Sequence, residues 1–169
     1  MENKLIYEIR RIAGAFIFYT RIPLPSSCFS AKTSHCSRYF SLVGWLVGGV
    51  SVGVWLLAQM MFSDSSGKLS DVSLPIAILL GMIAAVLLTG ALHEDGFADT
   101  CDGFGGGWSK EERLRIMKDS RIGTYGALGL VFLLWLKFFA LLQIETSILP
   151  WIWFAGNTLS RFVSISELS

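Results

Sequence analysis

The chain is poor in charge and in cysteine. Only 16% of its 169 residues are charged, whereas soluble proteins carry about 25%. Cys28, Cys36 and Cys101 form no CxxC pair, and an odd number at irregular spacing argues against a disulfide framework. The net charge of +1 gives no reason to expect nucleic-acid binding. Apolar residues make up 53% of the chain, more than a soluble domain of this length can bury.

Long apolar stretches follow one another along the chain and predict membrane spans, since a helix needs about 20 apolar residues to cross a bilayer. There are four of them: 39–63, 72–92, 122–144 and 146–165. The first two carry no charge, the third contains Lys137 and the fourth contains Arg161. The sequence therefore predicts an all-α, polytopic integral membrane protein with about four transmembrane helices in a single membrane domain, 1–169.

Basic residues predict the orientation of these spans, because Lys and Arg gather on the cytoplasmic side of a membrane. They are frequent before the first span and in 93–121, whereas 64–71 contains only Lys68. We therefore expect the N-terminus and the 93–121 loop to lie on the cytoplasmic face.

The N-terminal segment 1–38 predicts an interfacial helix. Its apolar residues recur at helical spacing and its charged residues fall elsewhere, as in helices that lie on a membrane surface. Pro23 and Pro25 are expected to end that helix, and 26–38 to form a polar connection.

Carboxylates cluster directly after the second span, at Glu94, Asp95, Asp99 and Asp102. If the helix continues past Leu92, the last three lie on one face at i, i+4 and i+7. Two such charges about 5 Å apart repel by roughly 3 kcal/mol at an effective dielectric constant near 20. Carboxylate oxygens suit Mg²⁺, Mn²⁺ or Ca²⁺. The pattern favours a divalent-metal site over acids that merely face water at the end of a span.

Glycines and basic residues follow the acidic cluster. Gly103 and Gly105–Gly107 form either a turn or a backbone cradle for phosphate, and the sequence leaves both open. Ser109 and Glu112 form a capping box that predicts a helix from Lys110 to about Ser120.

Two further cations, Lys118 and Arg121, then return towards the acids. They either contact phosphate or serve as ordinary positive-inside anchors, and the neighbouring carboxylates favour phosphate contact. A carboxylate–metal site beside such cations suits phosphoryl transfer. The sequence has no P-loop, GxSxG or HExxH motif.

Several of these segments resemble the cobalamin synthase family of adenosylcobinamide-GDP ribazoletransferases. The matching segments are FYTRIPLP (18–25), LVGWLVG (42–48), GALHEDGFADTCDGFGGG (90–107), MKDSRIGTYG (117–126) and, more faintly, LSRF (159–162). The acidic and KDSRIGTYG motifs are the most specific, and the resemblance covers nearly the whole chain. It implies a plasma-membrane enzyme of a bacterium or archaeon that continues beyond Ser169 into further membrane helices.

The resemblance also implies an activity. A hydroxyl of α-ribazole, or of its 5′-phosphate, attacks the phosphorus of adenosylcobinamide-GDP that bears the aminopropanol arm, and GMP leaves. Mg²⁺ is the implied cofactor, and the implied partners are these corrinoid and ribazole substrates and the lipid bilayer, with no nucleic acid.

The site residues follow by position. The implied metal ligands are Glu94, Asp95, Asp99 and Asp102. The implied phosphate-binding residues are Lys118, Arg121, Thr124, Gly105 and Gly106. Asp99, Asp102, Lys118 and Arg121 are the catalytic candidates, with Asp102 as the base.

Two other functions are compatible with parts of the sequence. A CDP-alcohol phosphotransferase uses similar acids, but its D-x2-D-G-x2-A-R pattern is absent because Phe104, Gly105 and Gly106 follow Asp102-Gly103. A cation transporter would use acids near a membrane, with Lys137 and Arg161 along the pathway. The sequence leaves the oligomeric state open.

Overall fold

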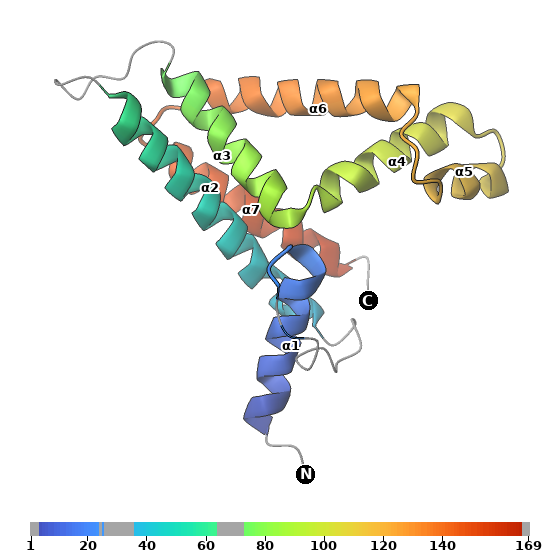
Figure 1. The fold of residues 1–169 in the computed structure, drawn as a ribbon, viewed down its shortest axis with the longest axis horizontal. Coiled ribbons are helices and arrows are strands. Elements are labelled where there is room, and N and C mark those ends of the chain that lie inside the picture. Colours follow the sequence, from blue (N-terminus) through green and yellow to red (C-terminus); the bar gives the residue numbers. More distant parts are fainter. Residues whose placement is uncertain (1–3, 24, 26–35, 64–72, 167–169) are drawn as a thin grey trace. The chain divides into compact units, whose positions relative to one another are not determined.

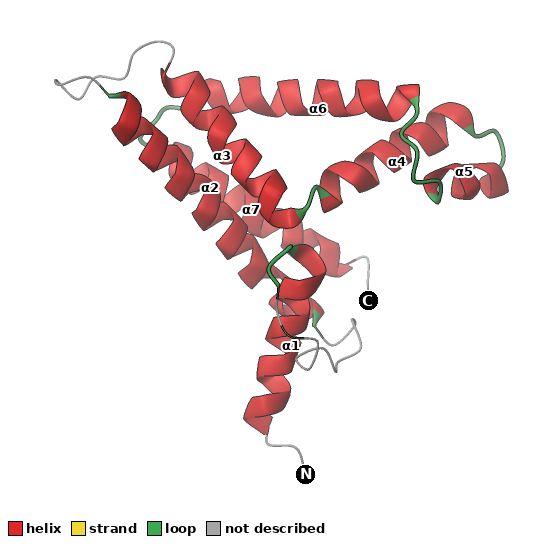
Figure 2. Ribbon diagram, viewed as in Figure 1, coloured by secondary structure: helices red, strands yellow, loops and turns green. Residues whose placement is uncertain are grey.

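The computed structural model describes residues 4–23, 25, 36–63 and 73–166, and the elements in these ranges are helices (Figures 1 and 2). They are α1 (Lys4–Tyr19), the short 3-10 helix η3 (Ser37–Tyr39), α2 (Phe40–Phe62), α3 (Ser73–Thr89), α4 (Leu92–Gly106), α5 (Lys110–Met117), α6 (Thr124–Leu142) and α7 (Leu149–Ser166). The prediction of an all-α protein is confirmed. The chain forms two compact units, Met1–Gly90 with Glu145–Ser169, and Ala91–Ile144.

In the first unit, α2 packs against both α3 and α7 (Figure 1). Val43, Val47 and Ser51 are fully buried on α2. At Gly44 an added Cβ would lie 2.7 Å from the backbone oxygen of Asn157 on α7. Small residues allow helix backbones to approach in this way, which is how helices associate where hydrocarbon surrounds them.

Helix α1 is joined to the start of α2 by aromatic and ionic contacts. The rings of Tyr19 and Phe40 meet edge to face, with centroids 4.6 Å apart. Glu8 accepts hydrogen bonds from Tyr39 at 2.5 Å and from Arg38 at 2.9 Å. The predicted N-terminal helix is confirmed and ends at Tyr19, before the prolines. Most of the expected polar connection, 26–35, lies outside the described residues.

Fewer helices than the expected four are long and apolar enough to cross a membrane. Among the described residues, α2 and α6 each meet this condition as single helices, whereas α3 and α4 meet it only when the two are taken together as one broken span. Helix α3 has 17 residues because it stops at Thr89, short of the predicted boundary at Leu92. Helix α7 does not meet the condition, since it carries Asn157 and Arg161, whose side chains hydrogen-bond to each other at 3.3 Å.

The break between α3 and α4 lies at two consecutive residues with left-handed backbone conformation, Gly90 (φ 66°) and Ala91 (φ 61°). Arg21 lies against this break, because its backbone N–H donates a hydrogen bond to the backbone oxygen of Leu88 at 2.9 Å. A Cβ on Gly90 would lie 2.5 Å from the Arg21 Nε. The expectation that the second span continues as one helix into the acidic cluster is therefore wrong, and α4 begins anew at Leu92.

Candidate functional site

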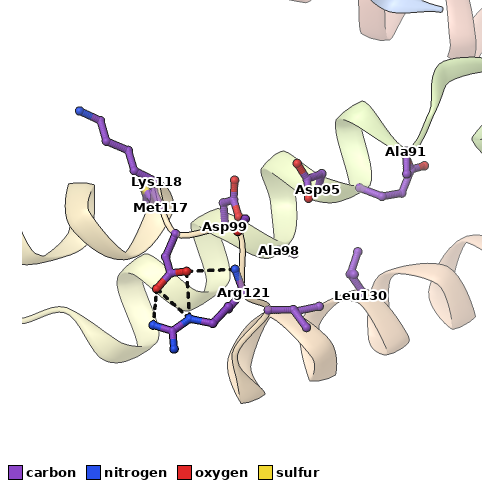
Figure 3. Close-up of a pocket in the computed structure, with 12 residues that line it drawn as sticks. Ala91, Asp95, Ala98, Asp99, Met117, Lys118, Arg121 and Leu130 are labelled. Atoms are coloured by element: carbon purple, nitrogen blue, oxygen red, sulfur yellow. Dashed lines mark hydrogen bonds and ion pairs between the residues drawn. The ribbon is translucent and has the colours of Figure 1, made fainter. Parts of the chain in front are cut away.

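A pocket of about 390 Å³ lies within the second unit, between α4 and the segment that joins α5 to α6 (Figure 3). The residues of α4 supply carboxylates and the connecting segment supplies cations, while apolar side chains complete the wall. The lining residues are Ala91, Glu94, Asp95, Ala98, Asp99, Met117, Lys118, Asp119, Ser120, Arg121, Ile122 and Leu130. The structure thus brings together Glu94, Asp95, Asp99, Lys118 and Arg121 from the predicted site.

The acidic wall consists of Glu94, Asp95 and Asp99. Figure 3 shows Asp95 and Asp99 on the same side of α4, as their i, i+4 spacing predicts. Asp99 lies on α4, outside α2 and α6, the two helices that are individually long and apolar enough to cross a membrane. Its pKa is raised by burial and by the nearby charges of Asp95 and Asp102. One oxygen of Glu94 is buried and accepts no hydrogen bond from the described residues. These groups therefore carry mutual repulsion that a cation would relieve.

Protein side chains alone do not complete a metal cage here. Within the described ranges, no three His, Cys, Asp or Glu side chains lie close enough together to hold a metal ion. Mg²⁺ commonly needs only one or two carboxylates, with water and substrate phosphates supplying its other ligands. The carboxylates of the acidic wall therefore fit a magnesium ion that also takes ligands from water and substrate phosphates. They do not fit a buried structural metal, which needs a full set of protein ligands.

The basic wall consists of Lys118 and Arg121. Arg121 pairs with Asp119 through Nη2 and Oδ2 at 2.7 Å, and its hydrogen bonds hold the pKa of Asp119 below the usual range. The Arg121 N–H also donates to Asp119 at 3.1 Å, which is an Asx-turn. Lys118 forms no ion pair within the described part of the chain and extends away from the carboxylates (Figure 3). Both cations are exposed and accessible to an anionic ligand.

Asp102 is held differently from the other predicted ligands. Its side chain is buried, and its two oxygens accept hydrogen bonds from the N–H groups of Gly123 (2.7 Å) and Gly126 (2.8 Å). Asp102 is not among the residues that line the pocket. Thr124 is the first residue of α6, is exposed, and also lies outside the lining.

The glycines after Asp102 continue the helix, because α4 extends to Gly106. A Cβ on Gly105 would lie 2.4 Å from the ring of Tyr125, and one on Gly103 would lie 2.7 Å from the Met117 side chain. These glycines permit close packing of α4 against its neighbours, and neither Gly105 nor Gly106 lines the pocket. The stretch that the sequence left open as a turn or a phosphate cradle is thus helix as far as Gly106.

The predicted capping box at the start of α5 is confirmed. Ser109 Oγ accepts a hydrogen bond from the Glu112 N–H at 3.1 Å. The Glu112 carboxylate accepts one from the Trp108 N–H at 3.0 Å, one residue before the usual partner. Helix α5 ends at Met117, earlier than the expected Ser120, and this leaves 118–122 free to form the pocket wall.

Sequence reasoning missed Asp119, Gly123 and Gly126. Asp119 stands two residues before Arg121, which is the spacing of an Asx-turn and could have been noticed. Gly123 and Gly126 show no local signal, because their partner Asp102 is 21 and 24 residues away.

Comparisons with known proteins bear on the whole chain. The profile of the family described as Cobalamin-5-phosphate synthase matches residues 11–168. Proteins named Adenosylcobinamide-GDP ribazoletransferase are similar: that of Shewanella frigidimarina is 47% identical over 98% of this chain and 61% of its own length. That of Leptospira interrogans is 45% identical, over 96% and 58%, and that of Vibrio cholerae is 42% identical, over 98% and 61%.

The chain therefore spans about 60% of the length of these curated relatives. No solved structure matches it. The extent of the profile match and the level of identity place this chain in the cobalamin-5-phosphate synthase family.

Proposed function

We propose that the pocket is the phosphoryl-transfer site of a magnesium-dependent membrane transferase at the cytoplasmic face of a bacterial or archaeal plasma membrane. The reaction joins adenosylcobinamide-GDP to α-ribazole, or to its 5′-phosphate, and releases GMP. The observation that carries this proposal is one pocket whose lining includes three carboxylates of α4 together with Lys118 and Arg121. The activity named for the relatives, adenosylcobinamide-GDP ribazoletransferase, supports the choice of substrates.

Asp95 and Asp99 would hold the Mg²⁺, with Glu94 beside them. A bound Mg²⁺ supplies positive charge against the pyrophosphate that links the corrinoid to GMP. Asp95 and Asp99 suit this role because no hydrogen bond or ion pair within the described residues occupies their carboxylates. Binding here would also offset the repulsion that raises the pKa of Asp99.

Lys118 and Arg121 would bind the phosphate oxygens. The guanidinium of Arg121, held by Asp119, presents its remaining N–H groups in a fixed orientation. Lys118 adds a second charge on a flexible side chain. These cations would bind the diphosphate of the substrate and stabilise the charge on the departing GMP.

The chemistry is an exchange of one P–O bond for another. The ribazole hydroxyl oxygen forms a bond to the phosphorus that bears the aminopropanol arm, the bond from that phosphorus to the GMP oxygen breaks, and the hydroxyl proton passes to a base. Glu94, Asp95 and Asp99 are the pocket carboxylates on α4, and the fourth, Asp119, is already paired with Arg121. We therefore place the base among the three carboxylates of α4.

The test measures GMP release by the purified chain in lipid nanodiscs, supplied with adenosylcobinamide-GDP, α-ribazole and Mg²⁺. Asp95→Asn and Asp99→Asn should each reduce the rate by roughly a hundredfold or more, the scale seen when a group that stabilises transition-state charge is lost. Glu111→Gln is the matched control, because Glu111 is exposed on α5 outside the pocket lining.

Near-normal Mg²⁺-dependent rates in both aspartate variants would refute the metal role. CMP release from a CDP-linked lipid and an alcohol, without GMP release from the corrinoid pair, would identify a CDP-alcohol phosphotransferase instead. Metal-dependent ion flux without nucleotide turnover would identify a transporter.

A further inference from the structure

We infer that Asp102 is a positioning residue that fixes the start of α6 against α4, and that it neither binds the metal nor accepts the substrate proton. The inference rests on the proposed function, since it divides the acidic motif of that same site into two roles. Asp95 and Asp99 remain the groups that face the ligand, while Asp102 holds together the two walls between which the ligand binds.

The first argument is that the Asp102 carboxylate is already occupied. It is 9% exposed, and each oxygen accepts one backbone N–H, from Gly123 at 2.7 Å and from Gly126 at 2.8 Å. These N–H groups belong to the first turn of α6, where a helix has no internal acceptors of its own. Because Gly123 at the N-cap has no side chain to cap the helix, a carboxylate from α4 does so and also complements the positive end of the helix dipole.

The second argument is that the surrounding backbone is shaped around this carboxylate. A Cβ on Gly123 would lie 2.4 Å from Asp102 Oδ1, and one on Gly126 would lie 2.3 Å from Oδ2. The same Cβ on Gly126 would be 3.0 Å from the backbone oxygen of Ala98. Two glycines one helical turn apart thus leave the space that Asp102 fills, so the three residues act as one joint.

The third argument is where this joint lies. Asp99 and Asp95 precede Asp102 on the same helix, by about one turn and two turns. The lining segment 117–122, which carries the basic wall, ends directly before Gly123. Fixing Gly123, two residues after Arg121, to α4 therefore fixes the end of this segment relative to the acidic wall. If this joint opens, Lys118 and Arg121 lose their set distance from the metal-binding carboxylates.

The experiment separates the two roles with two measurements on each variant, in nanodiscs. Hydrogen exchange of 122–130 in metal-free protein reports on the joint, and Mn²⁺ binding followed by electron paramagnetic resonance reports on the ligands. The variants are Asp102→Asn, which keeps one oxygen acceptor, Asp102→Ala, which keeps none, and Asp99→Asn as the matched control on the same helix.

We expect Asp102→Ala to speed exchange in 122–130 by at least about tenfold, since it removes two charge-assisted hydrogen bonds and the loss of one already has about that effect, and Asp102→Asn to speed it less. Both should retain Mn²⁺ affinity within about threefold, since each leaves the pocket carboxylates in place. Asp99→Asn should show the opposite pattern, with unchanged exchange and weakened Mn²⁺ binding. A rate assay should then show a raised KM for the nucleotide substrate in Asp102→Asn, with an unchanged Mg²⁺ requirement.

Loss of Mn²⁺ binding in Asp102→Asn, or exchange of 122–130 that matches the wild type, would overturn the inference. If Asp102→Ala does not fold, Asp102→Asn decides the matter alone, because Asn has the shape of Asp. If the wild type itself binds no Mn²⁺, the proposed function fails, while the exchange measurement still tests the joint in metal-free protein.

Discussion

Replacing Gly90 by Ala should destabilise the first unit by an amount that divides into two parts. The first part is the backbone, since Gly90 has φ 66° and an L-residue in the left-handed region costs about 1–2 kcal/mol. The second part is steric, since the added Cβ would lie 2.5 Å from Arg21 Nε and 2.8 Å from its Cγ. The lower entropy of the unfolded Ala chain returns about 0.4–1 kcal/mol.

These terms leave a net loss of about 1 kcal/mol from the backbone, with the displacement of Arg21 added to it. Thermal unfolding in detergent, followed by far-UV circular dichroism, should show a midpoint lower by at least about 2–4 °C. In an Arg21→Ala background the steric part disappears, so Gly90→Ala should cost less there. Such a double-mutant cycle isolates the contact between the two residues.

Gly96→Ala is the control, because Gly96 lies within α4 and nothing stands within 4 Å of its added Cβ. It should stabilise the protein by up to about 1 kcal/mol. The reasoning would be refuted if Gly90→Ala matched the wild type in stability, or if the cycle gave no coupling between Arg21 and Gly90.

Two further outcomes are expected. Gly44→Ala should lower the stability of the α2–α7 pair by about 1–3 kcal/mol, because its Cβ would meet rigid backbone at 2.7 Å. Gly49→Ala should not, because nothing lies within 4 Å of its added Cβ. Thermal unfolding of both variants checks this prediction, and equal midpoints would contradict it. The hydrogen bond from Tyr39, with the charges of Arg38 and Arg11, lowers the pKa of Glu8 from its ordinary 4.5, so its contribution to stability is present above that pH and is lost as the pH falls through the lowered pKa. The protection factors of the α1 amides, which correct for the intrinsic pH dependence of exchange, should therefore stay constant from neutral pH down to about 4.5 and then fall in the wild type. Glu8→Gln should show low protection throughout, and parallel profiles of the two proteins would contradict this assignment.

Patterns that depend on nearby residues could be predicted from the sequence. The amphipathic spacing in 1–38 predicts α1, and Ser109 with Glu112 predicts the start of α5 to the residue. The spacing of Asp95 and Asp99 correctly predicts their common face, because both positions fall within one helix whichever residue begins it. In each case the interaction that decides the structure lies within one or two helical turns.

Patterns that depend on distant residues could not be predicted in this way. The sequence GALHEDG continues an apolar helix without a proline, and the break within it occurs where Arg21, which is far away in the sequence, lies against Gly90. Asp102 likewise shares a helix face with the metal candidates, but the N–H groups that occupy it arrive from α6. Spacing shows which side chains share a face and does not show which of them tertiary contacts have already occupied.

The residues that line the pocket all come from one stretch of chain, Ala91 to Leu130. Bringing them together closes only short loops, and the entropic cost of closing a loop rises with its length. Contacts of such short range also form quickly. The site can therefore assemble early, as soon as this stretch has left the ribosome, without waiting for α7 to return to α2.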